Sequence, residues 1–220
     1  TQLGMQELDA ARKNLQKAVT LDPHHSSSHL ALGQLYNATG YRIPSLLAYS
    51  RFLILEPVSN RSNMALVELK GLLGSGIEKV DDQKINVFFN PDSPKDEGDF
   101  TGIEMMLSLS SASMETEENK TSSEFEKTSA VFELFLSMLG ENEALNESTG
   151  FAMNHYVPYF RELQAKGYSD TFLNIIFLSE NPEESQKWLE EEEESIQAFI
   201  EWSLNFPFYK GETATGSEEN

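Results

Sequence analysis

Apolar residues recur at every third or fourth position along most of the chain, which is the period of an amphipathic helix. In the N-terminal third this pattern covers residues 5–23, 26–57 and 59–73. Gly40 interrupts the middle stretch, and Pro44 follows where a proline fits the first turn of a new helix. The pattern therefore predicts that residues 26–57 form two helices joined by a short turn.

The same spacing returns after the middle of the chain, over residues 100–113, 122–140 and 152–166. Pro158 lies inside the last of these stretches and predicts a kink or a restart of the helix. The helix expected after the cap at Ser169 is apolar on most sides, so we expect it to be buried. A further helix is expected from Asn181, with an apolar stripe of Trp188, Leu189, Ile196, Phe199, Ile200 and Trp202.

Residues 77–100 break the helical pattern. Ile85, Val87 and Phe89 occupy alternate positions, which predicts a short extended segment. The following "NPDSPKDEGDF" is polar, with two prolines and a glycine, and is typical of a solvated hinge. The predicted fold class is all-α, divided into helical repeats (1–76), a linker (77–100), a C-terminal helical domain (101–210) and a disordered tail (211–220).

The first helices also carry an internal repeat. The segments "AARKNLQKAVTLDP" (10–23) and "PSLLAYSRFLILEP" (44–57) share small, bulky and acidic positions, and their closing prolines lie 34 residues apart. Between them stands His29-x-x-Leu32-Gly33-x-x-Tyr36. A fixed period of this length is typical of a helical repeat protein.

This pattern resembles the tetratricopeptide repeat (TPR), in which a large residue precedes Leu-Gly and Tyr, followed by Ala-x-x-x-Phe and a closing Pro. The resemblance covers about residues 5–73, and the C-terminal half matches no family known to us. His29, Ser45 and Tyr49 replace the usual Trp, Ala and Phe. Because residue 1 falls inside a repeat in this register, we expect further units upstream in the natural chain.

The resemblance implies a right-handed superhelix of helix pairs that binds a protein or peptide in its concave groove. A subtype of the family grips a C-terminal carboxylate with Lys, Asn and Arg, but only Asn37 and Arg61 are present here, so that subtype is not expected. Carried over to this chain, the groove candidates are Ser27, Leu30, Gln34, Asn37, Ala38, Arg61, Met64 and Glu68.

The net charge of the chain limits the classes of partner that it could bind. With 36 acidic and 16 basic residues, the chain has a formal net charge of −20, which disfavours nucleic acids and anionic membranes and favours a basic or mixed polar protein partner. No apolar run is long enough to cross a membrane, and there is no cysteine. These features do not indicate a cellular compartment.

Histidines suggest a metal site at first sight, because His24, His25 and His29 lie close together. A first-row metal needs three or four converging ligands. We therefore expect no metal site: His24 and His25 should face solvent after the repeat, and His29 should pack as the bulky residue of the next helix.

Catalytic motifs are absent as well: there is no Gly-rich phosphate loop, no His-Glu-x-x-His and no Gly-x-Ser-x-Gly. The sequence thus favours a binding scaffold that is not an enzyme and needs no cofactor. One alternative is a subunit of a larger assembly. Another is a small-molecule pocket in the C-terminal domain, lined by the aromatic candidates His155, Tyr156, Tyr159, Phe160 and Tyr168.

A run of five glutamates, 190–194, has two readings. It could dock a basic partner, or it could be the solvated face of a surface helix. The second is the commoner role of such runs, and we favour it.

Overall fold

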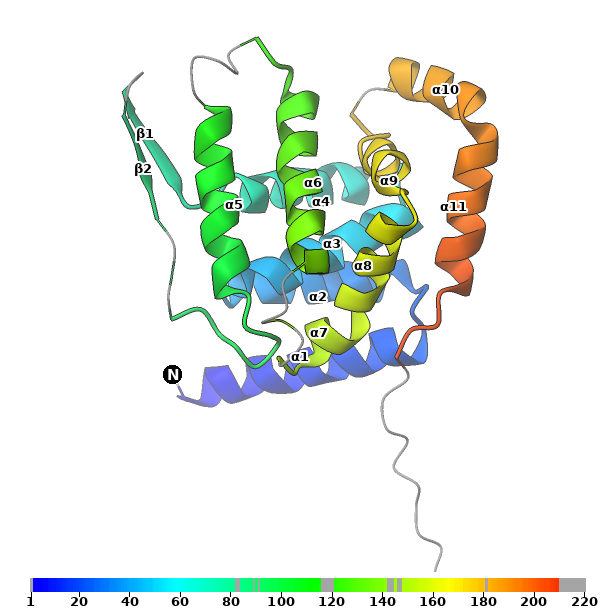
Figure 1. Cartoon of the computed structure of the whole chain (residues 1–220). Helices are drawn as coiled ribbons and strands as arrows, with labels where there is room; N and C mark the ends of the chain where they lie inside the picture. Colours follow the sequence, from blue (N-terminus) through cyan, green and yellow to red (C-terminus); the bar gives the residue numbers. More distant parts are fainter. Residues whose placement is uncertain are drawn as a thin grey trace, which may run out of the picture.

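The chain is mostly helical in a computed structural model, as the periodicity predicts (Figure 1). The structure describes residues 2–81, 84–88, 90, 92–115, 121–141, 145, 148–180 and 182–209. The tail expected to be disordered, 211–220, and Phe89 of the extended segment lie outside these residues.

Four helices make up the N-terminal part: α1 (Gln2–Leu21), α2 (Ser26–Ala38), α3 (Arg42–Leu55) and α4 (Asn60–Leu73). Each packs on the next one along the chain (Figure 1). Gly40 separates α2 from α3 with a φ of 83°, which a glycine adopts at little cost. These helices therefore follow the boundaries that the apolar period predicts.

The contact between α2 and α3 is close because Gly33 has no side chain. A Cβ at this position would stand 3.0 Å from Cδ1 of the Tyr49 ring. The hydroxyl of Ser45 adds a tie by donating to the Gly33 carbonyl over 2.8 Å. The small residues at the repeat positions thus let the large Tyr49 ring lie between two helices.

A β-hairpin follows, with β1 (Ile77–Asp81) antiparallel to β2 (Lys84–Val87). Ile77 pairs with Val87, and Lys79 pairs with Ile85. Residues 85–87 of the expected extended segment thus belong to one strand of a pair. Strand β1 was not predicted, because its charged residues mask any alternation of apolar and polar positions.

The C-terminal part contains α5 (Thr101–Met114), α6 (Glu124–Glu141), α7 (Phe151–His155), α8 (Val157–Ala165), α9 (Ser169–Ile176), α10 (Pro182–Glu191) and α11 (Glu193–Asn205). Figure 1 shows α5, α6 and α8 crossing over the N-terminal helices, with α11 along one side. The buried apolar residues of both parts belong to one core. Two expectations about α7–α9 agree with the structure: the helix restarts beside Pro158, and α9 is buried.

The single helix that was expected from Asn181 onwards differs from the structure. Residues 182–205 form two helices, α10 and α11, and Glu192 separates them. Glu190 and Glu194 would face each other one turn apart in a continuous helix, and this like-charge repulsion disfavours continuation. Ile200, expected in the buried stripe, is 45% exposed, whereas Phe199 is fully buried.

Arg42, at the start of α3, joins three elements. Its guanidinium donates to the carbonyls of Leu72, Leu73 and Ser75 at the end of α4, over 2.9–3.1 Å. It also donates to the Glu104 carbonyl and the Ser108 hydroxyl of α5. All five N–H donors of an arginine are thereby used, so this partly buried cation is well solvated by protein dipoles.

Candidate functional site

A groove runs between α2 and α4, with α3 beneath it. Its volume is about 580 Å³. The ring of Tyr49 lies at the floor of the groove, where it fits because Gly33 has no side chain. The lining residues are Leu30, Gln34, Asn37 and Ala38 from α2, Tyr49 from α3, and Arg61, Met64, Ala65 and Glu68 from α4.

This groove brings together the residues named from the repeat register. Seven of the eight groove candidates line it, namely Leu30, Gln34, Asn37, Ala38, Arg61, Met64 and Glu68. The eighth, Ser27, lies beside one end, where its hydroxyl accepts a hydrogen bond from Nη1 of Arg61 over 2.9 Å. Sequence reasoning did not name Tyr49 and Ala65 as lining residues.

Two polar pairs bridge the walls. Ser27 with Arg61 joins the start of α2 to the start of α4, and Asn37 with Glu68 joins their later turns over 2.9 Å. The two helices therefore run in the same direction along the groove. Arg61 and Glu68 are two turns apart, about 10 Å along the helix axis.

The electrostatics differ between the two ends. Arg61 pairs with Glu56, whose carboxylate also accepts hydrogen bonds from Ser59 and Ser26. Hydrogen bonds from Arg61 first, then from Ser59, lower the pKa of Glu56 to about 2. Glu68 at the other end forms no ion pair within the described part of the chain. Between the ends, Leu30, Met64 and the two alanines form an apolar stretch.

The aromatic candidates of the C-terminal part come together, but in a closed core. His155, Tyr156, Tyr159 and Phe160 are at most 1% exposed, and Tyr168 is partly buried. The Tyr159 ring stacks on Trp202 and on Phe208, with centroids 4.9 and 5.4 Å apart. Rings of α11 and of the segment after it thus occupy the space that a ligand would need.

The histidines have structural roles. His29 is fully buried, as expected; Nε2 donates to the Pro23 carbonyl over 3.0 Å, so Nδ1 is left to accept from the Tyr156 hydroxyl over 2.9 Å. His24 and His25 are exposed, again as expected. No group of three or more His, Asp or Glu residues in the described ranges could hold a metal ion.

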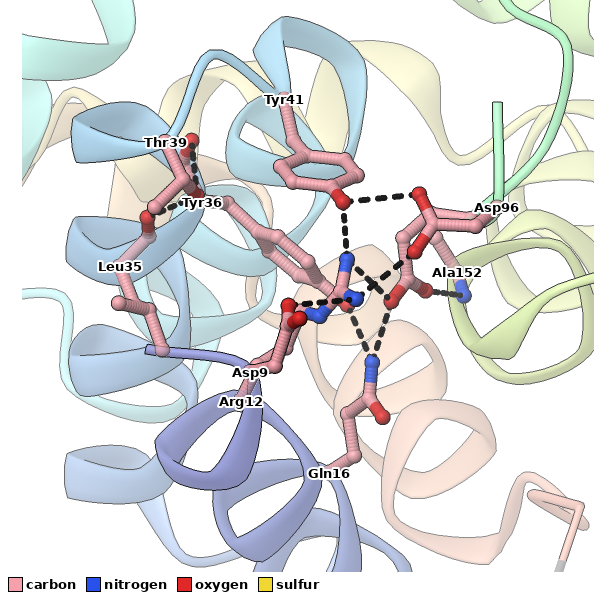
Figure 2. Close-up of polar contacts among 10 residues, drawn as sticks. Asp9, Arg12, Gln16, Leu35, Tyr36, Thr39, Tyr41, Asp96 and Ala152 are labelled. Atoms are coloured by element: carbon pink, nitrogen blue, oxygen red, sulfur yellow. Dashed lines mark hydrogen bonds and ion pairs between the residues drawn. The ribbon is translucent and has the colours of Figure 1, made fainter. Parts of the chain in front are cut away.

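A polar cluster joins α1 to the linker and to α7 (Figure 2). Arg12 forms an ion pair with Asp96 over 2.7 Å and hydrogen-bonds the Tyr41 hydroxyl, which in turn donates to Asp96 over 2.8 Å. These two donors outweigh burial and lower the pKa of Asp96. The next residue, Glu97, lies deeper in the same cluster.

Glu97 shows that the expected solvated hinge is wrong at this point. It is 3% exposed, and its carboxylate accepts from the backbone N–H of Ala152 over 3.1 Å and from the Gln16 amide. Burial raises its pKa, against the Ala152 N–H and the charge of Arg12. Because its partners are 55 and 81 residues away, no local pattern could reveal this contact.

Four residues of the glutamate run, Glu190, Glu191, Glu193 and Glu194, line a second groove on α10 and α11, together with Gln197, Ala198 and Glu201. Glu190 to Glu194 are all exposed. This placement agrees with a solvated face.

Within the described residues, no helix combines the length and the apolar character that a bilayer span requires. Comparison with models of known protein families, with curated protein sequences and with solved structures finds no match to this chain.

Proposed function

We propose that the chain is a helical-repeat scaffold of the TPR type, which binds a peptide segment of a partner protein in the groove between α2 and α4. The observation that carries this proposal is that residues of successive repeat units converge on one open groove. Ser27 and Arg61, which touch across it, are 34 residues apart, one repeat period. Catalysis is not part of the proposal, because the groove holds no pair of residues suited to acid–base or nucleophilic chemistry.

The parallel course of α2 and α4 supports this assignment. In a solenoid of helix pairs, the first helices of successive units line the concave face and run in one direction. The pairs Ser27–Arg61 and Asn37–Glu68 support the same relation for α2 and α4.

Groove chemistry suggests the form of the peptide. Leu30, Met64, Ala38 and Ala65 would accept one or two apolar side chains, and Met is suited to adapt to their shape. Glu68 carries a charge that no ion pair balances within the described residues, whereas Arg61 is already paired with Glu56. With a net charge of −20 over the whole chain, the favoured peptide combines an apolar anchor with a basic residue near Glu68.

The test is selection followed by mutation. A library of random dodecapeptides is displayed against the whole chain, and enriched peptides are measured by fluorescence anisotropy. We expect the enriched peptides to be apolar and to contain Lys or Arg, and their affinity to fall as the salt concentration rises. Met64→Glu and Glu68→Lys should each lower the affinity about tenfold or more.

Val67→Glu is the matched control. Val67 lies on the same helix and is 63% exposed, close to the 68% of Met64, but it does not line the groove. Its substitution should leave binding unchanged. Peptides that bind Met64→Glu and wild type equally, or a selection without enrichment, would contradict the proposal.

A further inference from the structure

Arg51 is a buried cation that the groove does not use. It lies nine residues after Arg42 on α3 and is 0% exposed. Its Nη1 donates to the Ser203 hydroxyl over 2.7 Å and its Nη2 to Nδ1 of His24 over 3.1 Å, while Nε has no hydrogen-bond partner. Within the described ranges no Asp or Glu forms an ion pair with it. Unlike Arg42, therefore, Arg51 is a charge with few compensating dipoles.

Aromatic rings supply much of its surroundings. The guanidinium carbon lies 4.8 Å from the centroid of the Tyr159 ring and 5.0 Å from that of Phe208. Such contacts stabilise a desolvated cation less than a carboxylate would. Phe208 belongs to residues 206–209, which we call the aromatic strap. The strap follows the end of α11, has no regular secondary structure, and passes the end of α1 (Figure 1).

Three of the four histidines gather around this cation and the strap. His155 stacks between Phe151 and Phe208, with centroids 4.9 and 4.7 Å away, and neither ring nitrogen has a hydrogen-bond partner. His24 meets Phe208 edge-on at 6.5 Å, and His29 lies 6.3 Å from His155. His24 must be neutral here, because an arginine only donates and Nδ1 must therefore accept.

Protonation is disfavoured throughout this group. Burial first, then the charge of Arg51, lower the pKa of His155 to about 4, while the Tyr209 backbone acts in the opposite direction. The same two causes lower the pKa of His24 and of His29.

Compensating charges are few. Asp22, at the exposed end, raises the pKa of His24, as does the backbone of Leu204. The Pro23 carbonyl does the same for His29. The phenols of Tyr156 and Tyr159 stay neutral, because burial raises their pKa, and the charge of Glu97 also raises the pKa of Tyr156.

We propose that Arg51, His24, His29 and His155 form an acid-sensitive latch, which holds the aromatic strap at neutral pH and releases it on acidification. A protonated His24 can no longer accept from Arg51. A protonated His155 places a second cation against Phe208 with no carboxylate beside it. Release of the strap would open the buried His155 imidazole to water, and this solvation favours its charged state.

The direction in pH follows from the pKa shifts. The folded pKa values of His24, His29 and His155 are below the unfolded value of about 6.5. The latch is therefore fully stable above about pH 6.5 and weakens as the pH falls towards the folded value, about 4 for His155.

Hydrogen exchange tests this, with rates corrected for the intrinsic effect of pH and global folding followed by circular dichroism. We expect the strap amides to lose protection between pH 6.5 and 4 while the helices stay folded. His155→Phe keeps the stacked ring without a titrating group, and His24→Gln keeps an acceptor for Arg51. Each should shift the midpoint of release to lower pH.

His25→Gln is the control, because His25 is exposed and its Nδ1 contacts Ser28 and not Arg51. Its midpoint should equal that of wild type. Phe208→Ala should release the strap already at neutral pH. The proposal fails if both histidine variants keep the wild-type midpoint, or if the strap is lost only together with the whole fold.

Discussion

One face of α3 lies under an open groove, and the opposite face is buried in a closed core. Tyr49 points to the groove between α2 and α4, and Arg51, two residues later and therefore about 200° around the helix, points to the aromatic cluster with Tyr159. On the first face, α2 and α4 both pack on α3, and a space of about 580 Å³ remains between them. On the second face, α8, α11 and the aromatic strap fill the space with rings.

The difference teaches where a binding surface arises. The groove is open because its walls are separate helices set apart by the helix beneath them. The cluster is closed because a later segment folds back over it. A high density of aromatic residues thus indicates a core, and the spacing of helices indicates a groove.

The largest difference between the two faces of α3 should appear in the free energy of unfolding of their variants. Tyr159→Ala removes a fully buried ring and its hydrogen bond to Ser203, so we expect a loss of about 3–5 kcal/mol in the free energy of unfolding. Met64→Ala, in the open groove, should change it by less than about 0.5 kcal/mol. Urea unfolding followed by circular dichroism measures both, and similar losses would erase the distinction between the two faces.

A smaller effect is expected at the floor of the groove. Gly33→Val would force side-chain atoms against the Tyr49 ring, and overpacking of this kind costs about 1–3 kcal/mol. Gly71→Val is the matched control, because a Cβ at Gly71 has no neighbour within 4 Å. Thermal unfolding of the two variants should therefore differ clearly. Equal melting temperatures would mean that α2 and α3 are not in close contact at Gly33.

The smallest effect concerns the rim of the groove. The pKa of Glu56 is lowered from 4.5 to about 2, so its ion pair contributes stability above about pH 4.5 that is lost as the pH falls towards 2. Glu56→Gln should cost about 1 kcal/mol at pH 7, since the pair is partly screened by solvent. The cost should shrink between pH 4.5 and 2. A constant difference from wild type across this range would show that the charge of Glu56 is not what stabilises the rim.

The groove residues were predictable because they depend on local order. The 34-residue period places Ser27 opposite Arg61, and helix periodicity puts Leu30, Gln34 and Asn37 on one face. Tyr49 was not predicted to line the groove, because its position in the repeat is typical of a residue that packs between helices. It does pack against Gly33, and its ring also forms the floor of the groove.

The state of the aromatic cluster was not predictable. The sequence places Tyr156, Tyr159 and Phe160 together on one helix, but whether rings or a ligand fill the space depends on Phe208, about 50 residues later. Arg51 gave no signal at all, since its partners are a serine and a histidine that belong to no motif. Contacts of this kind arise only from the tertiary fold.

The bond between Arg51 and Ser203 has a consequence for synthesis, because 152 residues separate the two. At about 5–20 residues per second, a ribosome takes on the order of ten seconds to add that length of chain. During that interval the Arg51 guanidinium lacks the Ser203 hydroxyl, and of these two hydrogen-bond partners only His24 has been synthesised. The hydrogen bonds of Arg51 are therefore complete only after the last turns of α11 have been added to the chain.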